Sequence, residues 1–177
     1  MTSTPSPPES DDVRASEVPS RELRAYEAML HHHETLVGCA RSLAEALSAA
    51  SSEDRPHEVE LRSFIAYFTG EVFPHAAAEE RTIYRAAMVQ ADLAPTVEAM
   101  IREHEALRVA VEQLGQPSTG ADAAMLADSI VMLFVAHVVK ENELFLPRLL
   151  ADSSVDLAQL LEQMHGPETP SDVQRPE

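Results

Sequence analysis

Cysteine, tryptophan and glycine are scarce in this sequence. It has one cysteine, Cys39, no tryptophan and five glycines among 177 residues. A single cysteine excludes an internal disulfide bond. The few glycines leave long uninterrupted segments, in which apolar residues recur at helical spacing without a competing strand pattern. Together these absences favour a protein built from long helices.

Basic residues are scarce as well. Lysine and arginine number 13 against 30 acidic residues, which gives a formal net charge of −17, and the basic residues form no cluster. Phosphate backbones and anionic membrane surfaces are bound through basic footprints. We therefore expect neither nucleic acid nor a membrane surface as a partner.

Features of membrane insertion and export are also missing. No apolar run approaches the length of a membrane span, and the first residues lack the basic and apolar regions of a signal peptide. We therefore expect a cytoplasmic protein. The sequence leaves the oligomeric state open.

The two ends differ in composition from the rest of the chain. Residues 1–19 and 166–177 are rich in proline, serine and acidic residues. Such segments bury too little apolar area to offset the entropy lost on ordering. We expect disordered tails at 1–19 and 166–177 around one folded domain at 20–165.

The folded part is expected to contain four long helices and one short one. They run over about 20–50, 57–90, 95–114, 121–150 and 154–164. Ser20 is the expected N-cap of the first helix, and Ser153 with Asp156 suggests a capping box at the last. Long helices joined by short loops predict an all-α fold: an up-down four-helix bundle with a short C-terminal extra helix and disordered tails.

Two near-copies of one motif occur in the second and fourth helices. His75-Ala-Ala-Ala-Glu79 reappears as His137-Val-Val-Lys-Glu141. In a helix, residues four apart lie one above the other, so an imidazole and a carboxylate can reach the same metal ion. With eight histidines and 30 acidic residues in the chain, about one or two such pairs arise by chance. The surrounding residues therefore decide the interpretation.

Apolar neighbours put both motifs on core-facing stripes. Those expected beside His75 are Phe68, Val72 and Ile83, and those beside His137 are Ile130, Leu133, Phe134, Leu144 and Phe145. A buried carboxylate is unfavourable unless it is paired or bound to a cation. No lysine or arginine lies on either stripe. Glu79 and Glu141 therefore require a counter-charge, which a metal ion would supply.

Pro74 interrupts the second helix immediately before His75. It lacks the N–H that would bond to Gly70, so a kink is expected there. Two interpretations stay open: a simple helix irregularity, or a kink that aims His75 into the core.

The first and third helices each add one candidate ligand. His104 lies on the apolar stripe of the third helix. In the first helix the run 31–33 offers three histidines, of which His33 shares its face with the most apolar set, and His32 is kept as the alternative. The candidate metal ligands are His33, His75, Glu79, His104, His137 and Glu141. Four imidazoles and two carboxylates suit one or two transition metals and leave coordination positions open for a small molecule.

Each candidate also has a simpler interpretation. A lone core histidine is usually structural, and a His/Glu pair four residues apart is more often on the surface. The other histidines (31, 32, 57 and 165) and Glu143 are expected in solvent, as is Glu80 unless it ligates or contacts a ligand. Glu103 and Glu105 are expected to point away from the site. Tyr26 either packs in the core or reaches the site.

With these elements in place, the sequence resembles the hemerythrin-like proteins, the HHE cation-binding domain family, over about residues 22–150. The motifs are His33-Glu-Thr-Leu36, His75-Ala-Ala-Ala-Glu79-Glu80, Glu103-His104 and His137-Val-Val-Lys-Glu141. The resemblance implies a four-helix bundle around a non-haem di-iron centre with two oxo- or hydroxo-bridged ions. The four histidines would be terminal ligands, and Glu79 and Glu141 would bridge the ions.

Two positions depart from the oxygen-carrying hemerythrins. Those proteins have a second histidine on the third helix, where this chain has Arg108. They have an aspartate on the fourth helix, where it has Asn142. Fewer histidines imply more open coordination, which favours reactive or sensing roles over reversible oxygen storage.

Three functions follow for comparison. The first is a di-iron protein that binds or reacts with hydrogen peroxide, O2 or NO. Its reaction could be a catalase-like dismutation of peroxide in oxidative stress. Whether the protein is an enzyme stays open. The second is a non-enzymatic module for iron or oxygen storage or sensing, and the third is a metal-free interaction bundle. Zinc and manganese accept the same ligands. No other catalytic apparatus is visible in the sequence.

Overall fold

The computed structural model of the chain describes residues 20–53, 55–116 and 119–164, and every regular element in those ranges is helical. The elements are α1 (Arg21–Ser52), α2 (Glu58–Tyr67), η1 (Phe68–Val72), α3 (Phe73–Arg81), α4 (Ile83–Ala87), α5 (Ala94–Leu114), α6 (Gly120–Lys140), η2 (Glu141–Phe145), α7 (Leu146–Ala151) and α8 (Leu157–Met164). The predicted tails lie outside the described residues. The prediction of an all-α fold is confirmed.

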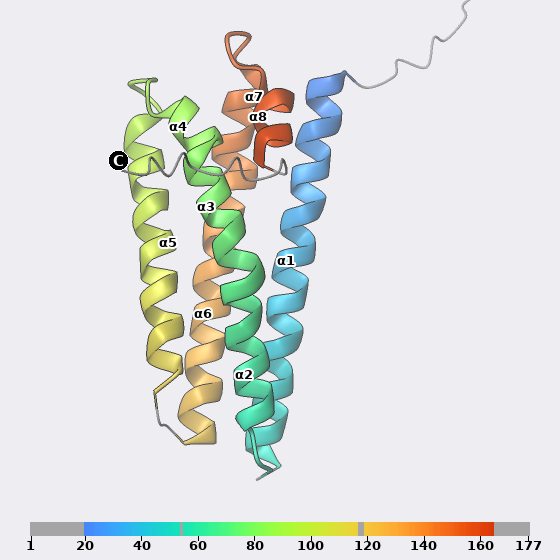
Figure 1. The fold of residues 1–177 in the computed structure, drawn as a ribbon, viewed down its shortest axis with the longest axis vertical. Helices are drawn as coiled ribbons and strands as arrows, with labels where there is room; N and C mark the ends of the chain where they lie inside the picture. Colours follow the sequence, from blue (N-terminus) through green and yellow to red (C-terminus); the bar gives the residue numbers. More distant parts are fainter. Residues whose placement is uncertain (1–19, 54, 117–118, 165–177) are drawn as a thin grey trace, which may run out of the picture.

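Four helical columns run side by side (Figure 1). They are α1, the run from α2 to α4, α5, and the run from α6 to α7. Short connections at alternate ends link successive columns, and α8 packs at one end against α1, α3 and α4. This is the expected bundle with a short extra helix, and it directs one face of each column into a common interior.

Short polar side chains cap the N-termini of α1, α6 and α8. The Ser20 hydroxyl accepts a hydrogen bond from the Leu23 N–H at 3.1 Å, as its role of N-cap predicts. The capping box proposed for Ser153 is wrong. Helix α8 begins only at Leu157, where Asp156 accepts from the Gln159 N–H at 2.8 Å. The preceding residues form a turn instead.

Each of the two helices that carry a His/Glu motif contains one π-helical turn. In η1 the Phe73 N–H bonds to the carbonyl of Phe68, and in η2 the Leu146 N–H bonds to that of Glu141, five residues back in each case. A proline stands two residues after the end of each turn, at Pro74 and Pro147. Proline has no N–H to continue the ordinary ladder, so the irregularity expected at Pro74 takes the form of a π turn.

The π turn η2 changes which residues face the core. Leu144, expected beside His137, is instead 60% exposed. The extra residue in the turn rotates the chain, so Phe145 and Leu146 take the inward positions and are fully buried. The expectation for Leu144 assumed a regular helix and is wrong for that reason.

The interior consists of two apolar clusters stacked along the bundle. The first includes Leu36, Phe64, Phe68, Leu107 and Phe134, and the second includes Met29, Ile83, Tyr84, Met100 and Phe145. On each column the candidate ligands fall between the two clusters. On α1, for example, His33 lies between Met29 and Leu36. The fold therefore holds a thin polar layer inside an apolar core.

One helical stretch among the described residues is long and apolar enough to cross a membrane by length and composition alone. It spans Gly120–Ala151, and its most apolar window has a mean hydropathy of 1.8. The expectation that no apolar segment approaches the length of a membrane span is therefore wrong. The window is 44% buried in the bundle, and the core helix of a soluble bundle has the same composition.

Phe68 tests how far the bundle depends on packing at the π turn. Its ring is fully buried and lies 4.9 Å from the ring of Phe64 and 5.7 Å from that of Phe134. Phe68→Ala should lower the free energy of unfolding by about 3–5 kcal/mol in urea titrations followed by circular dichroism. The control Met132→Ala, at a side chain 74% exposed, should change it by less than about 0.5 kcal/mol. Equal effects of the two substitutions would contradict this description of the core.

Candidate metal centre

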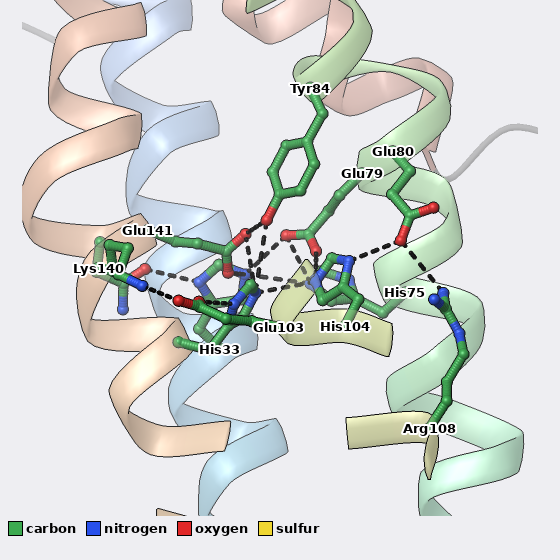
Figure 2. Close-up of polar contacts among 12 residues, drawn as sticks. His33, His75, Glu79, Glu80, Tyr84, Glu103, His104, Arg108, Lys140 and Glu141 are labelled. Carbon is green, nitrogen blue, oxygen red and sulfur yellow. Dashed lines mark hydrogen bonds and ion pairs between the residues drawn. The ribbon is translucent and has the colours of Figure 1, made fainter. Parts of the chain in front are cut away.

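The structure brings all six predicted site residues to one level of the bundle (Figure 2). His33 comes from α1, His75 and Glu79 from α3, His104 from α5, His137 from α6, and Glu141 from the start of η2. Five of them are buried, and His75 retains a side-chain exposure of 10%. His31 is exposed and His32 half-buried, so His33 is the member of that run that enters the site.

The four imidazoles form two pairs whose Nε2 atoms face each other. Nε2 of His33 lies 3.1 Å from Nε2 of His75. Nε2 of His104 lies 2.9 Å from that of His137. Because the first pair comes from α1 and α3 and the second from α5 and α6, each pair closes across two neighbouring columns.

The two carboxylates lie between these pairs. Glu79 has one oxygen 3.1 Å from Nε2 of His75 and the other 3.7 Å from Nε2 of His104. Glu141 has one oxygen 3.5 Å from Nε2 of His137 and the other 3.6 Å from Nε2 of His33. Each carboxylate thus spans both histidine pairs, as a bridge between two cations would.

Ligand atoms of the site fall into two groups, each compact enough to surround one ion. The groups are Glu79, His104, His137 and Glu141, and His33, His75 and Glu79. Imidazole nitrogen with carboxylate oxygen is a donor set that suits iron, zinc and manganese. The residues therefore fit a transition-metal pair, and their assignment as ligands stays a prediction.

The outer ring nitrogens are held by a second layer of polar side chains. Nδ1 of His33 lies 2.6 Å from the amide oxygen of Asn142. Nδ1 of His104 lies 2.8 Å from Glu80, and Nδ1 of His137 lies 2.9 Å from Glu103. These oxygens can only accept, so each Nδ1 must carry the proton. In the neutral ring, Nε2 then keeps its lone pair directed inward, as a metal ligand requires.

Two cations support this second layer. Arg108 donates to Glu80 at 3.2 Å, and Lys140 donates to Glu103. The expectation that Glu103 points away is wrong, because its side chain lies at the edge of α5 and reaches across to His137 on α6. Glu80 does contact a predicted ligand, as the sequence left open. The hydroxyl of Tyr26 donates to the backbone oxygen of Asn142 at 3.4 Å, and its side chain packs against the second apolar cluster.

Tyr84 is a site residue that the sequence did not identify. Its hydroxyl donates to Glu141, and its ring stacks on His104 at 5.5 Å with an interplanar angle of 8°. The residue is fully buried. The one signal in the sequence was its place beside Ile83 on a core stripe, because a buried tyrosine hydroxyl requires a partner.

Without metal, protons on histidine supply the positive charge. Burial lowers the pKa of His33, but the hydrogen bond to Glu79 and the charge of Glu141 outweigh it and raise that pKa to about 9. Burial would raise the pKa of Glu79, yet His75 and His33 hold it well below its ordinary value. The Glu79 carboxylate therefore stays ionised and is balanced by the His33 imidazolium.

The pKa values of His104, His137 and Tyr84 are shifted as well. Burial and the charge of His137 lower the pKa of His104, whereas Glu141 outweighs burial and raises the pKa of His137. His137 therefore binds a proton more readily than His104 does. Burial and the charge of Glu141 raise the pKa of Tyr84 well above its ordinary value, so its hydroxyl remains a hydrogen-bond donor.

Two cavities adjoin the candidate centre. A small one is lined by His75, Glu79, His104, His137 and Glu141, together with apolar residues. A larger one of about 500 Å³ lies between α1 and α8 and has His32 on its wall. The ring of His32 lies 4.7 Å from that of His75. The larger cavity thus ends one side chain away from the candidate ligands.

Comparison with known proteins identifies a family for the chain. Residues 24–165 match the family model described as hemerythrin HHE cation binding domain. No curated protein and no solved structure gives a significant match. The family match covers all six candidate ligands and the second layer around them.

The raised pKa of His33 predicts how the metal-free protein responds to pH. A group whose pKa is higher in the folded state stabilises the fold below its unfolded value, about 6.5, and that stabilisation is lost as pH rises through about 9. In the presence of a chelator, unfolding free energy should therefore fall between pH 6.5 and pH 9, by roughly 3 kcal/mol at most.

The matched variant is Glu79→Gln, which removes the main cause of the raised pKa without changing side-chain size. Urea titrations at four pH values should show a shallower slope for this variant than for the unmodified chain. A stability that is flat or rises over the same interval would contradict the assignment of the His33 proton.

Proposed function

The chain belongs to the hemerythrin HHE cation-binding domain family, and we propose that it is a non-haem di-iron protein that binds or reacts with a small oxidant or diatomic molecule. Hydrogen peroxide, O2 and NO are the candidate substrates or ligands. One observation carries the proposal: each of the two buried carboxylates, Glu79 and Glu141, lies between the same two histidine pairs. That arrangement suits two cations.

Charge supports the same proposal. Two carboxylates buried between apolar clusters are unfavourable unless cations neutralise them. The described lysine and arginine side chains nearest the centre, Lys140 and Arg108, neutralise the second-layer carboxylates Glu103 and Glu80 instead. A pair of divalent ions would supply the missing charge directly at Glu79 and Glu141.

Six protein ligands leave room for a further ligand. They are too few to complete two six-coordinate ions, so positions stay open for a small molecule. Iron held there would supply Lewis-acid and redox chemistry for a peroxide or a diatomic gas. Tyr84 holds Glu141 through its hydroxyl and keeps a proton close to the centre. The apolar clusters above and below exclude bulk water.

Access favours a small substrate over a large one. The cavity that touches the ligands is small, and the most exposed of the six side chains, His75, has a side-chain exposure of 10%. The larger cavity between α1 and α8 leads to the neighbouring ring of His32. A peroxide or diatomic molecule fits this geometry.

Loss of a bridging carboxylate should remove metal. Glu141→Ala removes one charge shared by both positions, so the purified variant should contain at least one iron fewer per chain than the unmodified protein when measured by elemental analysis. The control His31→Ala removes an exposed histidine of α1 and should leave the iron content unchanged. Wild-type iron content in Glu141→Ala would show that Glu141 is not a ligand.

Hydrogen peroxide separates the candidate functions. Iron-loaded protein that dismutates it converts two peroxide molecules to two waters and one O2, so rapid oxygen release is expected at an oxygen electrode. A stable coloured adduct without gas release would favour the storage or sensing alternative. If protein purified from cells grown in metal-replete medium contains no iron, manganese or zinc, only the metal-free interaction bundle remains.

A further inference from the structure

The outer nitrogens of the histidines have chemically different partners in the two pairs. In the second pair, His104 and His137 each donate Nδ1–H to a carboxylate, at 2.8 and 2.9 Å. In the first pair, His33 donates to the neutral amide oxygen of Asn142 at 2.6 Å. His75 packs its ring against that of His32. The two pairs are therefore unequal although each contains two imidazoles.

A carboxylate behind an imidazole strengthens it as a ligand. The anion draws the Nδ1 proton outward and increases electron density at Nε2, and it fixes the ring orientation. Charged acceptors form stronger bonds than neutral amides do. Both imidazoles of the second pair gain this effect, from Glu80 and Glu103. Among the residues that the structure describes, the first pair has only the amide of Asn142.

Two cations hold the second-layer carboxylates in place. Arg108 lies 3.2 Å from Glu80, and Lys140 contacts Glu103. The side chain of Arg108 points to this carboxylate and away from the centre (Figure 2). The chain thus uses position 108 to anchor the partner of His104.

The compact group of ligand atoms is also larger around the second pair than around the first. Four residues, Glu79, His104, His137 and Glu141, place ligand atoms within 4.8 Å of one another around the second pair. Around the first pair the corresponding group has three, His33, His75 and Glu79. Both the larger compact group of ligand atoms and the strength of the donors favour the position between His104 and His137.

We propose that the two metal positions are filled in order, with the ion between His104 and His137 bound first and more tightly than the ion between His33 and His75. This inference rests on the proposed di-metal function and adds an order to it. The chain at limiting metal then carries one fixed ion, and the second position is the one that exchanges with the medium.

Titration of the metal-free protein with Fe(II) under anaerobic conditions tests the order. Calorimetry and native mass spectrometry should resolve two binding steps in the unmodified chain. His75→Ala, which damages the weaker position, should keep the tight step within about threefold of its original affinity. His104→Ala should lose the tight step. Equal loss in both variants, or loss only in His75→Ala, would overturn the proposed order.

Conservative changes in the second layer provide a test that does not depend on removing a ligand. Glu80→Gln and Glu103→Gln should each weaken the first step about 10-fold or more. Glu105→Gln is the matched control, because Glu105 lies next to His104 on α5 and contacts Arg108 at 3.7 Å but no candidate ligand. Asn142→Asp should strengthen the second step, since His33 then gains a carboxylate.

The outcomes separate this inference from the proposed function. Unmodified protein that binds fewer than two ions would refute the di-metal function itself. Two ions bound with an unchanged first step in Glu80→Gln and Glu103→Gln would refute only the order. Melting curves of each variant with chelator identify any that fails to fold, in which case the remaining second-layer variants decide.

Discussion

Burial of two carboxylates between two apolar clusters is the constraint on which the rest of this structure depends. Glu79 and Glu141 are each about 1% exposed, and burying a carboxylate in this way is unfavourable without positive charge close by. The four histidines around them serve both states of the protein. Protonated His33 balances Glu79 when metal is absent, and the same Nε2 atoms face the position of a cation when metal is present.

The second layer turns this charge balance into a defined geometry. Glu80, Glu103 and Asn142 hold the outer nitrogens, so the inner lone pairs of three imidazoles point at one region. Arg108 and Lys140 neutralise the two carboxylates of this layer from outside. Acidic groups can therefore surround the centre without adding net negative charge to it. A bundle arranged in this way would hold a metal ion rigidly and leave the remaining coordination positions open.

Most of the fold and the six central residues could be predicted from the sequence, because helical spacing shows which residues share a core-facing stripe. Spacing cannot show where a long side chain at the edge of a stripe goes, and Glu103 was misplaced for that reason. It also assumes regular helices, so the π turn η2 reversed the expectation for Leu144. The partner of Tyr84 lies on another column, and no local pattern could reveal it.

Proton release during metal binding tests the central claim most directly. Calorimetry of Fe(II) binding to the metal-free protein at pH 7.5, in buffers of different ionisation enthalpy, gives the number of protons released per chain. If metal ions replace the His33 proton as the counter-charge of the buried carboxylates, two ions should bind with release of about one proton or more per chain. Absence of binding, or binding of two ions without proton release, would contradict the account.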